Sequence, residues 1–448
     1  MNQHSELPAG HGFAAGAESQ GSCLLAQLPL SHLQLSSPMS CILTHKAPYT
    51  LARKISAVSF FTALLLFLTG CGYNYRPVVD VVPKPGGDPQ AFALALVVNN
   101  GGTPGSTSEL NVSGDTNAGN FLAGQGPVHA AYLGGLSAAF VANRDSDTVS
   151  AYAPTQSATD VQTISLPSAS RPVYIVSSET PNNGNCFSGN NARSACVYVA
   201  NSGTNSVGII DSNLLVLQNS GIPVGNKPVA MVETPDARKL YVANQIDGTV
   251  SVITTADMKN IATLAVGSNP VWMLLRNDGA RLYVVNQSSS TVTVIDTSTD
   301  TVIKTLGVGA SPVHAFFDNR LQRLWVVNGA ANTVSVFAAD TDTLPLLATV
   351  PVGTSPVAVT VLADGSRAYV VNSVSNNVTI ISSLNFSITK TVPVGLSPSW
   401  IASSSDSSKV FTTNRTSNSV SILRTSDDSI VTTLPTGSSS PVFVTVGP

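Results

Sequence analysis

A four-residue signature recurs along most of the chain and constrains its fold more than any other feature. A large apolar or aromatic residue is followed by two small or β-branched residues and an asparagine, as in Tyr283-Val-Val-Asn286. The asparagines of the successive copies are Asn99, Asn143, Asn201, Asn244, Asn286, Asn328, Asn372 and Asn414. They are 44, 58, 43, 42, 42, 44 and 42 residues apart, which indicates one structural unit repeated along the chain.

Each repeat has the pattern of four short strands. A Gly-x-x-Pro turn, such as Gly267 to Pro270, precedes a short apolar strand, an Asp-rich turn and the signature strand. An alternating strand such as 291–296 and a last strand such as 302–306 complete the unit. Such a unit cannot cover both of its apolar faces, so neighbouring units must stack. We therefore predict an all-β chain that forms a single β-propeller of four-stranded blades, with a right-handed helical solenoid as the alternative.

The two ends of the repeat region predict how the ring closes. The first copy begins at its second strand, while residues 441–446 form an additional opening strand at the C-terminus. Pairing of this C-terminal strand into the first blade gives eight blades, which is the count we favour. A competing opening strand at 76–79 exists, and seven blades, with the Asn99 repeat outside the ring, is the alternative.

These repeats resemble the YVTN family of propeller repeats from about Leu96 to the C-terminus. The third signature position is Ala, Val or Thr, and all three fit a strand. The resemblance implies a propeller in a cell-surface or envelope protein. Other propellers of this type resemble lactonase-like hydrolases and the haem-binding propeller of nitrite reductases. Many relatives are seven-bladed.

The N-terminal region has the features of an export signal. Arg53 and Lys54 precede a 55–68 apolar run that is too short to span a bilayer comfortably, and Leu68-Thr-Gly-Cys71 follows. This ending resembles the lipobox of bacterial lipoproteins, which implies that Cys71 is acylated and becomes the first mature residue. A non-cleaved membrane anchor is the alternative.

We therefore expect three regions in the chain. Residues 1–70 form the leader and signal peptide, with Met39 as a candidate true start; 71–91 form a tether, and 92–448 the propeller. We expect an exported protein, lipid-anchored to the bacterial cell envelope on its periplasmic side or at the cell surface.

Two cysteines remain in the predicted propeller, and both lie in the longest repeat. Cys186 and Cys196 are ten positions apart in an exported protein, a context that favours a local disulfide. The insertion that contains them is our candidate contact loop for a partner, and we expect deletion of 182–193 to leave folding largely intact but to reduce partner capture.

Composition excludes some partners. Charged residues make up 10% of the chain and the net charge is -3, so no basic field is available for nucleic acid. We expect a monomer that binds an envelope protein or a small ligand and contacts the membrane through its lipid.

One repeat position is rich in aromatic residues. It lies two residues after each opening proline and is occupied, in chain order, by His129, Tyr174, Ala230, Trp272, His314, Ala358, Trp400 and Phe443. These side chains predict either a binding mouth at the central channel or packing between blades, which we favour. His129 and His314 fall on opposite sides of an eight-bladed ring. Since no carboxylate or cysteine joins them, we predict no metal and no cofactor.

The remaining polar residues favour a structural interpretation. The repeated asparagines are expected to cap turns, and Asp211, Asp296 and Asp300 lack the spacing of a calcium loop and are interpreted as turn residues. No hydrolase elbow, phosphate loop or zinc-protease motif is present, so we name no catalytic residue. We predict a non-catalytic binding or scaffold propeller of the cell envelope. The alternative is a propeller enzyme or cofactor carrier, either a lactonase-like hydrolase or a haem-binding propeller.

Overall fold

The computed structural model describes residues 94–133, 138–153, 160–178, 186–187, 193–437 and 440–447. The predicted leader, Cys71, the tether and the competing strand at 76–79 lie outside the described residues. Two compact units divide the chain, Met1–Val79 and Asp80–Pro448, and the propeller lies within the second.

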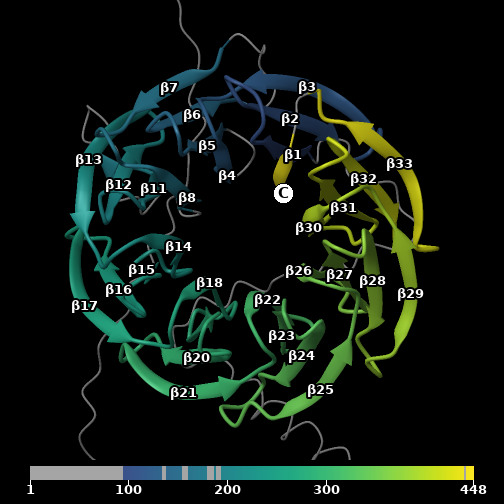
Figure 1. Ribbon diagram of the computed structural model, residues 1–448. Helices are drawn as coiled ribbons and strands as arrows, with labels where there is room; N and C mark the ends of the chain where they lie inside the picture. Colours follow the sequence, from purple (N-terminus) through teal and green to yellow (C-terminus); the bar gives the residue numbers. More distant parts are fainter. Residues whose placement is uncertain are drawn as a thin grey trace, which may run out of the picture. The chain divides into compact units, whose positions relative to one another are not determined.

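Eight four-stranded antiparallel sheets form a ring around a central axis, as predicted (Figure 1). Each sheet is one blade, and its first strand lies nearest the axis. The first blade consists of β34 (Pro441–Val446), β1 (Leu94–Asn99), β2 (Ser106–Asn111) and β3 (Thr116–Leu122). Blades two to four consist of β4 (Pro127–Leu133), β5 (Ala138–Asn143), β6 (Thr148–Tyr152), β7 (Gln162–Ser165); β8 (Pro172–Ser177), β11 (Cys196–Asn201), β12 (Ser206–Asp211), β13 (Val216–Pro223); and β14 (Pro228–Glu233), β15 (Lys239–Asn244), β16 (Thr249–Thr254), β17 (Lys259–Ala265).

The other four blades follow the same order in the second half of the chain. They consist of β18 (Pro270–Leu275), β19 (Arg281–Asn286), β20 (Thr291–Asp296), β21 (Thr301–Gly307); β22 (Pro312–Asp318), β23 (Arg323–Asn328), β24 (Thr333–Ala338), β25 (Leu346–Pro351); β26 (Pro356–Val361), β27 (Arg367–Asn372), β28 (Asn377–Ser382), β29 (Ile388–Pro393); and β30 (Pro398–Ser403), β31 (Lys409–Asn414), β32 (Ser419–Arg424), β33 (Ser429–Pro435). A two-stranded sheet, β9 (Cys186–Phe187) and β10 (Arg193–Ser194), lies in the long third repeat.

The C-terminal strand closes the ring, which confirms the prediction of eight blades and shows that the seven-bladed alternative is wrong. Strand β34 pairs antiparallel with β1, with Ala95 opposite Val446 and Val98 opposite Phe443. The Asn99 repeat therefore lies inside the ring as part of the first blade. This pairing joins the two ends of the repeat region in one sheet, so β1 is paired on both of its edges.

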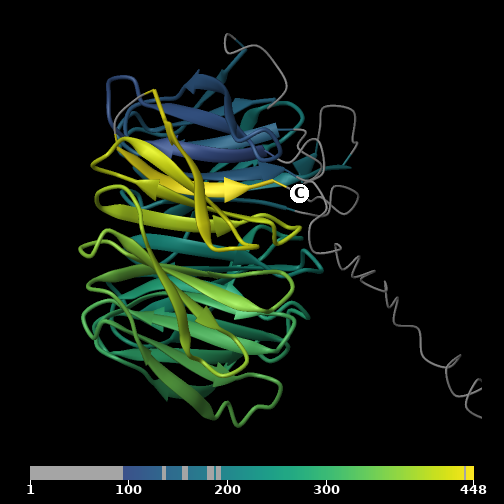
Figure 2. The same cartoon turned by 90° about the vertical axis from the view of Figure 1, so that its right-hand side faces the viewer.

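The two faces of the ring carry different strand ends. The innermost strands run toward the face on which the chain ends, and β1 begins on that same face because its Ala95 pairs with Val446. We call it the C-terminal face; it lies on the right in Figure 2. The opposite face carries the Gly-x-x-Pro turns and the ends of the signature strands.

The core consists of eight hydrophobic clusters, one in each interface between neighbouring blades. The first signature residue anchors each of them, since these side chains are among the largest that are fully buried: Leu96, Phe140, Tyr198, Tyr241, Tyr283, Trp325, Tyr369 and Phe411. An aromatic ring at this place fills the wedge that opens between two twisted sheets. The repeat of large and small residues is therefore a consequence of packing blade on blade.

The signature asparagines are structural, but they do not act as turn caps with left-handed backbone. The Asn286 amide donates from Nδ2 to Thr291 at 3.2 Å and to Thr293 at 2.9 Å, both in the next strand. All eight asparagine side chains are fully buried. The Gly-x-x-Pro turn that opens this blade packs closely against Asn286: a Cβ on Gly267 would lie 2.7 Å from the Cβ of Asn286. The positive φ of this hairpin belongs to Ser290 instead.

Candidate functional site

The six large side chains of the aromatic-rich repeat position meet at the axis of the ring. His129 stacks on Tyr174 with ring centroids 3.9 Å apart, and Phe443 lies 4.3 Å from His129 on its other side. Trp400 contacts Phe443 at 5.0 Å and Trp272 at 5.4 Å. Trp272 and Trp400 belong to the fifth and eighth blades, so their contact crosses the channel. These six residues form what we call the axial aromatic cluster: His129, Tyr174, Trp272, His314, Trp400 and Phe443.

The two alanines at this repeat position leave room for the cluster. Ala230 and Ala358 are fully buried in the fourth and seventh blades. Neighbouring rings lean across these gaps, with Tyr174 and Trp272 6.0 Å apart and His314 and Trp400 5.0 Å apart. The rings thereby meet across the axis, and Tyr174, Trp272 and Trp400 also pack on the apolar clusters between blades.

Both histidines connect neighbouring blades. The Nδ1 atom of His129 accepts a hydrogen bond from the backbone N–H of Ile175, and that of His314 accepts one from Val359, each at 3.4 Å. Each bond satisfies an N–H on the free inner edge of the next blade. Burial lowers the pKa of both imidazoles to about 3, so they are neutral at pH 7, with the proton on Nε2. Trp272 makes a similar link, donating from Nε1 to the carbonyl of Ala315 at 3.0 Å.

A cavity of about 880 Å³ lies on the C-terminal side of the axial aromatic cluster, which forms its floor. Its walls are the ends of inner strands from several blades, including 130–132, 175–177, 401–403 and 444–447. Residues with hydroxyl groups are spread over these walls, among them Ser177, Thr360, Ser403, Ser405 and Thr445. None of the described lining residues carries an aspartate, glutamate, lysine or arginine side chain. The site therefore combines an aromatic floor with neutral, hydrogen-bonding walls.

The predicted disulfide is present between Cys186 and Cys196. It ties the insertion of the third repeat to the start of β11, on the C-terminal face. Cys186 is fully buried in the cluster between the third and fourth blades, beside Tyr198, Met231 and Leu240. The expected tolerance to deletion of 182–193 is therefore unfavourable on structural grounds, because that deletion removes a buried core residue and its disulfide.

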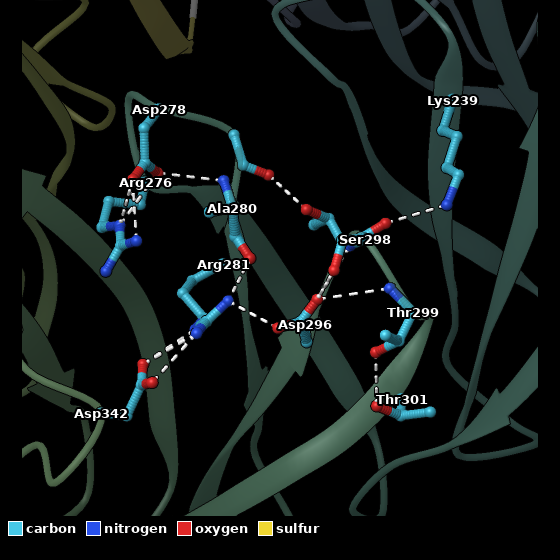
Figure 3. A network of polar contacts seen from close by, with 12 residues as sticks. Lys239, Arg276, Asp278, Ala280, Arg281, Asp296, Ser298, Thr299, Thr301 and Asp342 are labelled. Carbon is cyan, nitrogen blue, oxygen red and sulfur yellow. Dashed lines mark hydrogen bonds and ion pairs between the residues drawn. The ribbon is translucent and has the colours of Figure 1, made fainter. Parts of the chain in front are cut away.

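The sequence reading missed a set of polar contacts between blades, which Figure 3 shows in part. In the last five blades the second strand begins with a basic residue that reaches the next blade, and we call each such contact a blade latch. Lys239 binds Asp300 at 2.7 Å, Arg281 binds Asp342 at 3.0 Å, and Arg367 binds Asp428 at 2.6 Å. Arg323 donates instead to the carbonyl of Ser383, and Lys409 binds Asp115 of the first blade.

Of the three aspartates that we interpret as turn residues, Asp300 also takes part in a latch, whereas Asp211 and Asp296 accept hydrogen bonds within their own turns. Asp300 accepts a hydrogen bond from Tyr241 at 2.6 Å as well as the Lys239 ion pair, and Asp296 binds Arg281 at 2.7 Å. Asp211 is fully buried and accepts bonds from its own turn. The sequence does contain a signal for the latches: a basic residue stands two positions before the signature aromatic in each of the last five blades. No group of three or more potential metal ligands occurs among the described residues.

The fold and these contacts define an eight-bladed β-propeller. The family model of YNCE-like β-propellers matches residues 226–357, which confirms the predicted kinship over this part of the chain. The comparison with curated proteins gives no match. Within the described residues no helix is long and apolar enough to cross a bilayer.

Solved structures of low sequence identity share the fold. Dihydro-haem d1 dehydrogenase NirN matches with a TM-score of 0.62 and 14% identity, over 81% of this chain and 76% of its own. AztD from Citrobacter koseri matches with a TM-score of 0.58 and 12% identity, over 79% and 97%. Hydrazine synthase from Kuenenia stuttgartiensis matches with a TM-score of 0.52 and 19% identity, over 67% and 96%. At such low sequence identity these similarities establish a shared fold only, so function has to be argued from the site.

Proposed function

We propose that this protein is a non-catalytic binding propeller of the cell envelope that holds a flat, small ligand in the cavity on its C-terminal face. The axial aromatic cluster carries this proposal. Rings that meet across the axis provide a floor on which a planar or sugar-like molecule can stack, and the wall hydroxyls can orient it. A volume of about 880 Å³ suits one such molecule.

The chemistry of the lining favours binding over catalysis. A general acid or base works best when its pKa lies near the working pH. The two histidines have a pKa lowered to about 3 and use Nδ1 to bind the neighbouring blade, so they neither accept nor store a proton at pH 7. The described walls add no carboxylate or amine side chain.

The envelope location in this proposal rests on the sequence alone. The basic flank, the short apolar run at 55–68 and the lipobox-like ending at Cys71 support export and lipid attachment.

The test is ligand binding by the full mature protein. A panel of uncharged aromatic and sugar-like compounds is screened by thermal stabilisation, and hits are measured by calorimetry. Trp400→Ala should abolish binding by removing the ring that contacts both Trp272 and Phe443. Phe386→Ala is the control, because Phe386 lies in an outer turn and packs on Arg323 and Trp325, away from the cavity. Equal binding by both variants would refute the site.

A haem carrier is the second candidate. NirN is described as acting on dihydro-haem d1, and two neutral histidines lie in the cavity floor. Only their Nε2 atoms remain for iron, because each Nδ1 is already bonded. A Soret band after incubation with haemin that is lost in His129→Ala would support this function; a spectrum without one would exclude it.

A further inference from the structure

The floor of the cavity contains three N–H groups that the described part of the chain leaves without a partner. They belong to His129, His314 and Trp400, which all line the cavity. The Nδ1 atom of each histidine accepts a bond from the next blade, so the proton lies on Nε2, at the other edge of the imidazole. No described residue accepts a hydrogen bond from either Nε2 atom or from the indole Nε1 of Trp400.

These three nitrogens are accessible from the cavity. The side-chain polar atoms that are both buried and without a partner include Nε1 of Trp325, but none of the three. His129 and Trp400 are partly exposed, and His314 keeps 5% of its surface exposed. Because the space that these side chains line is the cavity, a ligand on the floor can reach their N–H groups.

The three groups can only donate hydrogen bonds. An indole nitrogen is a donor only, and a neutral imidazole whose Nδ1 is already bonded has only its Nε2–H group to offer. Burial lowers the pKa of both histidines to about 3, so this state does not change near pH 7. A molecule that rests on the floor must therefore supply lone pairs to it.

The surroundings favour an uncharged acceptor. The rings contact one another around the axis, with His129 4.3 Å from Phe443, Phe443 5.0 Å from Trp400, and Trp400 5.0 Å from His314. The described lining contains no lysine or arginine that would balance an anion. Since a buried charge without a counterion is costly, a neutral carbonyl oxygen fits this floor better than a carboxylate.

We propose that the cavity selects flat, uncharged ligands that carry carbonyl oxygens at the edge of the ring system. The Nε2–H groups of His129 and His314 and the Nε1–H group of Trp400 donate to these oxygens. This inference rests on the proposed function and makes it more specific, because it names the polar group of the ligand. A ligand N–H at the same place would face another N–H and leave both without an acceptor.

A matched pair of probes tests the donor floor. The compounds 1-indanone and indole are flat bicyclic molecules of similar size that present a carbonyl oxygen or an N–H group on the five-membered ring. Calorimetry at pH 7 should show that the wild type prefers 1-indanone by about tenfold, in keeping with the cost of an unpaired donor.

Two substitutions should reduce this preference while an aromatic ring remains in place. Trp400→Phe and His129→Phe each remove one N–H donor, and each should lower the preference for 1-indanone by about threefold. Trp325→Phe is the matched control, because it makes the same change at a tryptophan that is fully buried between blades and outside the described cavity lining. It should keep the preference of the wild type.

The outcomes separate this inference from the proposed function. Equal affinity of the wild type for both probes, tighter binding of indole, or a preference that survives in both Trp400→Phe and His129→Phe overturns the donor floor and leaves the aromatic site intact. Binding of neither probe overturns both proposals. A preference that is lost in Trp325→Phe to the same extent assigns the effect to a general change of the core and also overturns the donor floor.

Discussion

Lys409 of the eighth blade binds Asp115 of the first blade, with 2.5 Å between Nζ and Oδ1. Its ammonium group also donates to the carbonyl of Val112 at 2.6 Å. The same latch that joins neighbouring blades in the second half of the chain thus also joins the last blade to the first. Ring closure has two components, the backbone pairing of β34 with β1 and this largely buried ion pair.

Removal of this latch should destabilise the ring. Lys409→Met leaves Asp115 and the Val112 carbonyl without their partner, and we expect a loss of about 2 to 3 kcal/mol in the free energy of unfolding, measured with urea. Arg238→Met is the control, because the Arg238–Asp236 pair is exposed, with side-chain exposures of 83% and 58%; its loss should stay below about 0.5 kcal/mol. Equal effects of the two substitutions would contradict a structural role for the latch.

Glu109 should make stability fall as the pH rises. Its pKa is raised to about 7 from 4.5, so between these values the folded chain binds a proton that the unfolded chain has lost. Stability from this group is therefore present at pH 5 and lost by pH 8. The phenols of Tyr132 and Tyr152 interact electrostatically with Glu109, and burial raises the pKa of each above its usual value of 10, so they do not titrate in this range. Relative to the wild type, Glu109→Gln should gain about 2 to 3 kcal/mol between pH 5 and pH 8 in urea unfolding. A stability difference between the two proteins that does not change with pH would show that folding does not shift the pKa of Glu109.

The two axial histidines should have the opposite effect. Their pKa is lowered to about 3 from 6.5, so acid protonates the unfolded chain first and stability falls as the pH drops below 6.5. Each histidine should contribute a loss of about 2 kcal/mol between pH 7 and pH 5. His129→Phe and His314→Phe should each reduce the loss of stability between pH 7 and pH 5 by that amount. Tyr174→Phe, which changes no group that titrates there, should leave it unchanged.

The signature asparagines should be required for stability at every blade. Asn286→Ala removes the bonds to Thr291 and Thr293 and leaves a buried gap, with an expected loss of about 1 to 3 kcal/mol in unfolding free energy. Asn319→Ala, at an exposed turn, should cost less than about 0.5 kcal/mol. Similar losses in the two variants would show that the hydrogen bonds of the buried amide do not contribute to the free energy of unfolding.

The proposed lipid anchor depends on one residue outside the described part of the chain. Cys71→Ala should release the protein from the membrane fraction, because acylation needs that thiol. Fractionation followed by immunoblotting measures this, and Cys196→Ala serves as a cysteine-substitution control that keeps Cys71. A Cys71→Ala protein that stays in the membrane fraction would point to the non-cleaved anchor.

The repeat made the architecture predictable. Eight in-register copies of a four-strand pattern admit few structures, and the unmatched strand at 441–446 predicted closure through β1, as found. The disulfide was predictable because Cys186 and Cys196 are close in sequence. The blade latches were missed because each joins residues about sixty positions apart, such as Lys239 and Asp300; such a pair becomes visible only once the repeats are aligned as neighbouring blades.

The sequence by itself determined the ring, its blade count and the position at which aromatic residues collect, because local strand patterns and their period are properties of the chain. Only the tertiary structure decided what those residues do together. A contact such as that of Trp272 with Trp400 depends on the radius of the closed ring and on how far each side chain reaches toward the axis. No spacing along the chain encodes those distances directly.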